Sequence, residues 1–415
     1  MTRYWPCAAL ALACTGHAQA QDDDAWRTGA SLEAWAYGSH NEVRRDSLLN
    51  PGNRVAAIAS NQALLDARLN LRAEHDAFDV LLAPRAVAQT GKQDADAELS
   101  QGFIRYKSSG GVWPSVVLGR ELYTWGPANF RSPSNPFYFD AGRTRPLALV
   151  PGIDLARGTW NVNGLRVSAA HVFSTSLAQP GTGQRDTDLI KIDRQGGNYL
   201  ASLVVSKQRG AAPFAGGFAQ YTLDDAWLLY GEFGSGRQAT ALVPGISNQP
   251  SYLPPYRLTQ PAPRSTTFLL GAAYTLENGQ VLQGEYLHDS GGYSADQAAR
   301  YFAQARAAGR SAQTNPAAAY ATLGLALGRA PRLLGRDYLW LNWQSNGQDS
   351  RQFWRLAWTQ AVHDRSGQAQ LYFERNYAPK LSGFVSLTAN RGSVATEFGA
   401  LLGGSIALGL KWFVF

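Results

Sequence analysis

Short segments in which apolar and polar side chains alternate recur along most of the chain. The clearest is NQALLDARLNLRAEH, residues 61–75. One face of this segment carries Ala63, Leu65, Ala67, Leu69, Leu71 and Ala73, and the other carries Asp66, Arg68, Asn70, Arg72 and Glu74. Because successive side chains of a strand point to opposite sides, the pattern predicts a strand with one apolar and one charged face. The apolar face would form the core of a soluble sandwich or the lipid-facing side of a transmembrane barrel.

Other segments of this kind are about ten residues long, the length at which a tilted strand crosses a membrane. They lie at 29–37, 79–90, 98–108, 113–121, 163–173, 186–194, 198–207, 213–222, 226–236, 265–276, 280–289, 335–345, 351–363, 368–376, 381–390 and 404–415. Bacterial barrels have an even number of strands. The alternation of strand direction requires one further crossing between 113–121 and 163–173, and residues 148–158 are the only candidate. The prediction is a single all-β, antiparallel transmembrane barrel of about 18 strands, with about 16 as the alternative.

The two ends of the chain favour a barrel in the outer membrane of a Gram-negative cell. Residues 1–20 contain an early arginine, a short apolar run and the small-x-small end Ala18-Gln19-Ala20, which predict a signal peptide cleaved near Ala20. Lipidation of Cys14 is the alternative, but the residues before it form a poor lipoprotein signal. Residues 21–415 are then the barrel, which contacts outer-membrane lipid and lipopolysaccharide. Its last strand ends at Phe415 and resembles the signal read by the barrel-assembly machinery.

Two segments depart from the alternation. LYTWGPANFRSPSNPFYFD opens residues 122–145, and its prolines exclude an interior strand, while its aromatic residues disfavour a solvated loop. We expect it to fold inward as a constriction loop, where irregular backbone faces water or protein. Residues 290–334 form a long outer loop in which residues 294–310 have helical composition, with Ser294 as cap and Gly309 as stop. That helix is interpreted either as a lid over the mouth or as a surface element.

The predicted inner face of the barrel is rich in arginine. The chain has 38 Lys+Arg, of which only six are lysine. Alternation and the inward loop place twelve candidate solute-contacting residues in the lumen: Arg68, Arg72, Arg85, Arg105, Arg120, Trp125, Arg131, Arg166, Arg336, Tyr338, Trp340 and Arg355. Guanidinium groups bind carboxylate or phosphate in bidentate fashion, and aromatic rings stack on sugars. The arginines predict an anion-attracting lumen. The alternative is that they pair with inward carboxylates such as Asp66, Glu74, Glu285 and Glu374 and stiffen the barrel.

A resemblance to known families rests on residues 116–154. VVLGRELYTWGPANFRSPSNPF resembles the Gly-Arg-x-x-x-x-Trp-Gly signature of outer-membrane channels of the alginate-export type. This implies that Arg120, Trp125 and Gly126 lie at the base of an inward loop. The same stretch, continued to RTRPLALVPGID, is also similar to the capsule surface-assembly (Wzi) barrels, which implies a surface lectin.

The functional prediction is a porin-like channel that passes small anionic or saccharide solutes, or exports an anionic polysaccharide. The alternative is a surface barrel that binds capsule or exopolysaccharide. An enzyme is not expected, since His288, Asp289 and Ser290 are neighbours in sequence and cannot form a triad together. No metal-ligand or phosphate-loop motif occurs, so neither a cofactor nor a metal is expected, and nucleic acid is not an expected partner.

Overall fold

The structure is a computed structural model that describes residues 26–108, 113–140, 142–174, 185–238, 242–244, 256–258, 264–328, 333–349 and 351–415. The expected signal peptide, residues 1–20, lies outside the described residues, so its cleavage stays a prediction.

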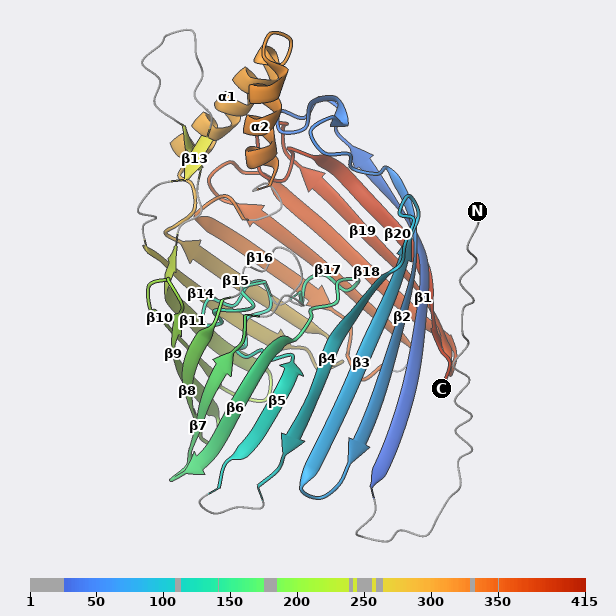
Figure 1. Ribbon diagram of the computed structural model, residues 1–415, viewed down its shortest axis with the longest axis vertical. Coiled ribbons are helices and arrows are strands. Elements are labelled where there is room, and N and C mark those ends of the chain that lie inside the picture. The colour runs from blue at the N-terminus through green and yellow to red at the C-terminus, as the bar shows by residue number, and fades with distance from the viewer. Residues whose placement is uncertain are drawn as a thin grey trace.

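Eighteen strands form one closed antiparallel barrel (Figure 1). Each strand pairs with the next along the chain, and β1 also pairs with β20, which closes the sheet. The strands are β1 (Arg27–Val43), β2 (Asn61–Glu74), β3 (Phe78–Gln89), β4 (Asp96–Tyr106), β5 (Ser115–Glu121), β6 (Ile153–Val162), β7 (Leu165–Val172), β8 (Thr187–Gln195), β9 (Tyr199–Gln208), β10 (Phe214–Thr222), β11 (Trp227–Gln238), β14 (Arg264–Thr275), β15 (Val281–Asp289), β16 (Asp337–Gln344), β17 (Gln352–Ala361), β18 (Gly367–Ala378), β19 (Leu381–Arg391) and β20 (Leu402–Phe413). The prediction of about 18 strands is confirmed, including the crossing inferred from parity, which is β6.

Alternation sorts the side chains between the two faces of the wall as the sequence predicted. On β2, Leu65 faces outward and is 53% exposed, whereas the adjacent Asp66 faces inward and is 1% exposed. The same contrast holds on β9, where Leu203 is 61% exposed and Val204 is 1% exposed. The outer face is therefore apolar, and the inner face carries the polar and charged groups.

The connections differ in length at the two ends of the barrel, which we name the turn end and the loop end. The turn end has short connections such as residues 276–280, where Gly279 adopts φ +78°, a conformation that favours glycine. In another turn, the Asp224 carboxylate accepts the N–H groups of Ala226 and Trp227. The loop end carries the long connections, including both helices, which lie above the rim in Figure 1.

The helical loop differs in part from expectation. Helix α1 (Ala295–Ser311) begins at a capping box formed by Ser294 and Gln297, as the sequence indicated. Gly309 does not stop it, because the last turn runs on to Ser311. A second helix, α2 (Pro316–Leu327), was not predicted, although Asn315 caps it and Pro316 occupies its first turn. A short ribbon of β12 (Leu242–Pro244) and β13 (Tyr256–Leu258) and the 3-10 turn η1 (Pro51–Asn53) were not predicted either.

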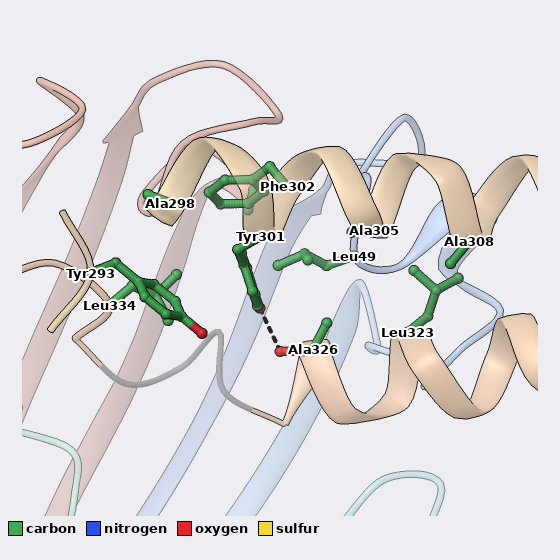
Figure 2. Packing of buried hydrophobic residues seen from close by; sticks show 11 residues of the cluster. Leu49, Tyr293, Ala298, Tyr301, Phe302, Ala305, Ala308, Leu323, Ala326 and Leu334 are labelled. Atoms are coloured by element: carbon green, nitrogen blue, oxygen red, sulfur yellow. Dashed lines mark hydrogen bonds between the residues drawn. The ribbon is translucent and has the colours of Figure 1, made fainter. Parts of the chain in front are cut away.

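The two helices pack against each other and against two other loops at the same end. The Tyr301 hydroxyl donates to the Ala326 carbonyl at 2.7 Å, and Leu49 of the β1–β2 loop lies beside Tyr301 (Figure 2). Ala400 of the β19–β20 loop belongs to the same cluster. Neither helix is long and apolar enough to cross a membrane. The helical loop is therefore fastened to its neighbouring loops by a small apolar core of its own.

Candidate functional site

The segment between β5 and β6, residues 122–152, folds into the barrel, and we name it the inward loop. Its backbone is held by two carboxylates on the opposite wall. Glu232 of β11 accepts the Ala128 N–H at 2.9 Å. Glu285 of β15 accepts the N–H groups of Asn129 and Phe130 at 2.7 and 2.8 Å. The inward fold expected for residues 122–145 is what the structure shows.

Glu232 is almost fully enclosed by the inward loop. Its Oε2 also accepts the hydroxyls of Ser132 and Ser134, each at 2.7 Å. Two glycines permit this close approach. A Cβ on Gly126, which has φ +89°, would lie 2.3 Å from Glu232 Oε1, and a Cβ on Gly234 would lie 2.1 Å from the Pro133 carbonyl oxygen. Any larger residue at either position would push the loop away from the wall.

The aromatic side chains of the inward loop fill one side of the lumen. Trp125 is 8% exposed and packs in a cluster with Ala170, Leu189, Val204, Phe214 and Phe218 on the wall from β7 to β10. Its indole N–H donates to the Ser134 carbonyl at 3.2 Å. Tyr138 packs in a second cluster with Phe103, Val117, Ile153, Leu155 and Val172. Loop and wall thus share apolar cores along β4 to β10.

On the other side, a cavity of about 490 Å³ remains between the inward loop and strands β17 to β20. The loop contributes Arg131, Asp140 and Arg145 to it, and the wall contributes Arg355. At the loop end the cavity is bounded by Ile58, Leu333 and Leu401, which come from three different connections. This is the candidate site through which a solute would move.

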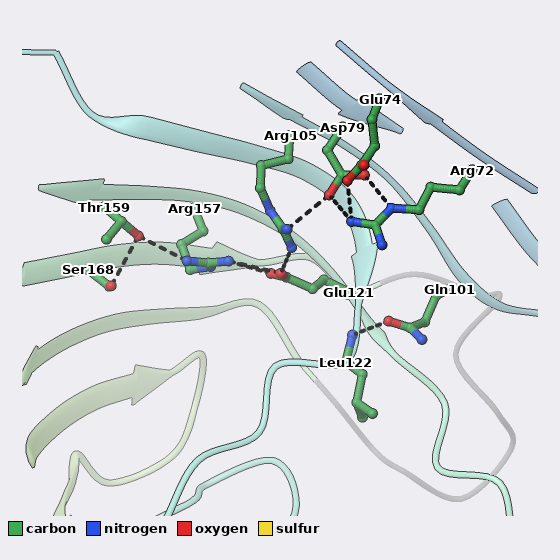
Figure 3. Close-up of polar contacts among 10 residues, drawn as sticks. All are labelled: Arg72, Glu74, Asp79, Gln101, Arg105, Glu121, Leu122, Arg157, Thr159 and Ser168. Atoms are coloured by element: carbon green, nitrogen blue, oxygen red, sulfur yellow. Dashed lines mark hydrogen bonds and ion pairs between the residues drawn. The ribbon is translucent and has the colours of Figure 1, made fainter. Parts of the chain in front are cut away.

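Most of the inward arginines on β2 to β6 are paired with acids, as Figure 3 shows for part of the set. Arg85 binds Asp66 and Glu98, each at 2.8 Å. Glu121 binds both Arg105 at 2.8 Å and Arg157 at 2.7 Å (Figure 3). The other pairs are Arg68–Asp66, Arg72–Glu74, Arg72–Asp79, Arg105–Asp79 and Arg120–Asp154. Along this wall the positive charges are largely cancelled, which fits the stiffening alternative.

The twelve predicted solute-contacting residues are therefore split among different environments. Arg131 and Arg355 line the cavity. The inner face of β2 to β6, which we name the paired wall because its arginines are ion-paired, holds Arg68, Arg72, Arg85, Arg105 and Arg120. Arg166 of β7 is exposed near the turn end, and Arg336 lies at the loop end, where its Nε donates to the Gly292 carbonyl at 3.0 Å.

The aromatic members of the set lie elsewhere, and none of their rings lines the cavity. Trp125 is covered by the apolar cluster described above. Tyr338 is fully buried and donates to Glu397 at 2.6 Å. Trp340 is 2% exposed and stacks on Phe130, with the ring centroids 6.3 Å apart. In the structure these rings pack within the inward loop or against it.

Sequence reasoning placed Glu285 on the inner face as a candidate partner of the arginines and not of a loop, and it passed over Glu232 and Glu397. A signal for Glu232 was present: it is an acid on the inner face of β11, among Tyr230, Gly234 and other uncharged inward residues. A lone inward carboxylate opposite a loop rich in backbone N–H donors is a candidate for holding that loop by hydrogen bonds. The loop residue that binds Glu232, Ser132, is however 100 residues away in the chain.

A third buried carboxylate, Glu397, holds together the connections at the loop end. It lies in the β19–β20 loop and accepts the N–H of Leu334 at 3.2 Å and that of Gly335 at 3.3 Å. His363 of the β17–β18 loop lies beside it, with Nε2 3.9 Å from the Glu397 carboxylate. Burial raises the pKa of Glu397 to about 7. This carboxyl group therefore ties the helical loop to the edge of the cavity.

Replacing both anchors, Glu232→Ala and Glu285→Ala, should release the inward loop, because Asn129, Phe130 and Ser132 lose their acceptors. Leaving buried donors unsatisfied costs about 1–3 kcal/mol per group. Trypsin should then cut after Arg131 or Arg143 in the folded barrel, at least tenfold faster than in the wild type. Glu98→Ala, which removes an inward acid paired with Arg85, is the control. Equal cleavage of all three proteins would show that the two carboxylates do not hold the loop.

Docking of the helical loop should weaken as pH rises. The docked Glu397 keeps its proton up to about pH 7, whereas a released one titrates near 4.5. The docked state thus binds more protons between these values, so its stabilisation is complete below pH 4.5 and is lost as pH rises through 7. Amide exchange at Leu334 and Gly335, corrected for intrinsic rates, should be faster at pH 8 than at pH 5. Glu397→Gln should remove this dependence; an unchanged pH profile in that variant would contradict the assignment.

Neither a protein-family model nor a curated protein sequence matches the chain. Among solved structures, it is similar to Acinetobacter baumannii OccAB1, at 10% identity and TM-score 0.54, covering 94% of this chain and 97% of that one. Pseudomonas aeruginosa OccK3 (OpdO) matches at 11% identity and TM-score 0.54, covering 93% and 95%, and Pseudomonas aeruginosa OprD at 10% identity and TM-score 0.52, covering 95% and 99%. At these identities the likeness establishes the fold alone. It shows neither the alginate-export nor the capsule-assembly resemblance.

Proposed function

We propose that the chain is an outer-membrane channel, porin-like in operation, that passes small anionic or saccharide solutes through a lumen narrowed by the inward loop. The observation that carries the proposal is the joint presence of an apolar outer face and a polar inner cavity in one closed barrel. Large apolar side chains point outward around the circumference: Leu65, Leu82, Ile104, Leu118, Ile190, Leu203, Val205, Leu229, Leu270, Leu339, Leu341, Leu356 and Leu408. An exposed apolar band of this extent requires a lipid environment.

Aromatic residues near the turn end support the same placement. Exposed rings include Phe78, Tyr106, Tyr199, Tyr221, Trp227, Trp343, Tyr377 and Trp412. Girdles of aromatic residues mark the membrane–water boundary in barrels of this class. With the turn end in the periplasm, the loop end faces outside, and outer-membrane lipid and lipopolysaccharide surround the band. Phe415 is 55% exposed at the turn end, where the barrel-assembly machinery would read it.

The structural neighbours support a channel over the other functions that the sequence left open. OccK3, OccAB1 and OprD are outer-membrane channels of the porin type. Their fold covers more than nine-tenths of this chain. No feature of the described residues favours polysaccharide export or surface carbohydrate binding over passage of small solutes.

Anion preference is assigned to Arg355 instead of the paired wall. Its Nη1 donates to the Arg143 carbonyl at 2.6 Å, and it takes part in none of the ion pairs of the described residues. The cavity's other two arginines, Arg131 and Arg145, both contact Asp140, at 3.5 and 2.6 Å. These two arginines share the single carboxylate of Asp140, so together with Arg355 the arginines of the cavity leave an excess of positive charge, which raises the local anion concentration.

Arg355→Gln should therefore reduce the ratio of chloride to potassium permeability, measured from reversal potentials across a planar bilayer under a KCl gradient. The expected change is about twofold or more, because the field of one charge is focused in a narrow, low-dielectric passage. Arg300→Gln, on the exposed surface of α1, is the control with the same change in net charge. Equal effects of the two variants would place Arg355 outside the solute path.

A further inference from the structure

The cavity wall opposite the inward loop carries an ordered array of uncharged hydrogen-bonding groups. Six inward side chains of β18, β19 and β20 form what we name the amide–hydroxyl wall: Gln368, Gln370, Ser386, Thr388, Asn390 and Ser405. All six line the cavity and are half-buried. The wall contrasts with the paired acids and arginines across the lumen, since none of its members is ionisable.

Strand register arranges these groups in rows across the sheet. Gln370 lies opposite Thr388, which lies opposite Ser405 on the next strand. Gln368 lies opposite Asn390 in the row nearer the loop end. Alternate residues of one strand are about 7 Å apart. The wall therefore presents successive rows of donors and acceptors along the direction of transport.

The amide groups are held in place by one another. Gln370 donates to Gln368 at 2.6 Å, Gln368 donates to Asn390 at 2.8 Å, and Asn390 donates to the Leu402 carbonyl at 3.0 Å. Each amide nitrogen keeps a second N–H for another acceptor. None of the hydrogen bonds among the described residues uses the hydroxyls of Ser386, Thr388 or Ser405. The array is thus preorganised and still has capacity for a ligand.

The remaining surface of the cavity combines the charged groups Arg131, Asp140, Arg145, Arg355 and Glu397 with several apolar side chains. Phe130 and Leu147 of the inward loop face it, together with Ile58 and Leu401 from the connections at the loop end. Below the wall lies the ring of Tyr372, stacked on Phe384 with the ring centroids 6.2 Å apart. A cavity that offers rows of hydrogen-bonding groups and apolar side chains such as Phe130 and Leu147 fits a pyranose ring, which has hydroxyl groups at its edge and C–H groups on its faces.

We propose that the amide–hydroxyl wall is a binding track for the hydroxyl groups of an uncharged saccharide. The proposal rests on the channel function proposed above and names the solute class for its cavity. Lysine or arginine side chains on the wall would favour anions, whereas amides and hydroxyls both donate to and accept from sugar hydroxyls. The volume of about 490 Å³ lies within the range of small-molecule sites.

The test uses the full-length protein in planar bilayers, with maltose as probe. Maltose should interrupt the ion current of the wild-type channel in a saturable manner, whereas a polyethylene glycol of equal hydrodynamic radius should not saturate. The double variant Gln370→Leu/Thr388→Val should bind maltose about tenfold more weakly, equivalent to ~1.4 kcal/mol. Both substitutions remove hydrogen-bonding groups while preserving the size and charge of the side chains.

Gln220→Leu/Thr267→Val is the matched control, with the same replacements on inward positions of β10 and β14 that do not line the cavity. Heat-modifiable gel mobility checks that each barrel is closed, and Thr388→Val alone gives a milder variant if the double variant does not fold. If the channel conducts ions but maltose does not block it in a saturable manner, the saccharide track is refuted and the channel function is not. The same conclusion follows if the control variant loses as much maltose affinity as Gln370→Leu/Thr388→Val. A folded protein that conducts no ions would overturn the channel itself.

Discussion

Two carboxylates in the barrel wall determine how the lumen is divided. An 18-strand barrel encloses more space than its own side chains fill, so the path of a solute depends on what else lies inside. Here the inward loop crosses that space, and its backbone donors meet Glu232 and Glu285. Hydrogen bonds of this kind are strengthened where water is excluded. The anchors hold the loop against one side, which leaves the cavity along β17 to β20.

The ion pairs on the inner face of β2 to β6 have a different effect. Each of these arginines pairs with an acid on its own strand or on an adjacent strand. Glu121, for example, pairs with both Arg105 and Arg157. Such pairs fix the geometry of neighbouring strands, but they contribute little net field, because opposite charges lie within about 3 Å of each other. In the proposed function, selectivity arises at groups whose charge is not cancelled, which beside the cavity are Arg355 and the excess of Arg131 and Arg145 over Asp140.

Much of the fold followed from the sequence because the signals are local. A period of two residues marks a strand wherever it occurs, and the requirement of even parity located β6 without a clear pattern of its own. The inward loop was recognisable from its prolines and aromatic residues. Helix α2 was missed although its cap and first-turn proline are ordinary signals, because alanine-rich segments in a loop carry no apolar periodicity.

The site was less accessible because its contacts join distant residues. Facing could be inferred for Arg85, but its partners Asp66 and Glu98 depend on strand register. Trp125 was expected to face a solute. An aromatic ring in an inward loop can lie either beside the solute path or against the barrel wall. Packing against Leu189 and Val204 decides between them, and no local pattern encodes that choice.

The division of the lumen can be tested most directly by cysteine accessibility, since the only native cysteines are Cys7 and Cys14 in the expected signal peptide. Thr388→Cys would place a thiol on the cavity wall, and Val204→Cys would place one beneath the inward loop. A trimethylammonium-ethyl methanethiosulfonate reagent added to the open channel should react with Thr388→Cys and lower its conductance, and should leave Val204→Cys unchanged. Rapid modification of Val204→Cys with loss of current, and no effect at Thr388→Cys, would contradict the proposed path.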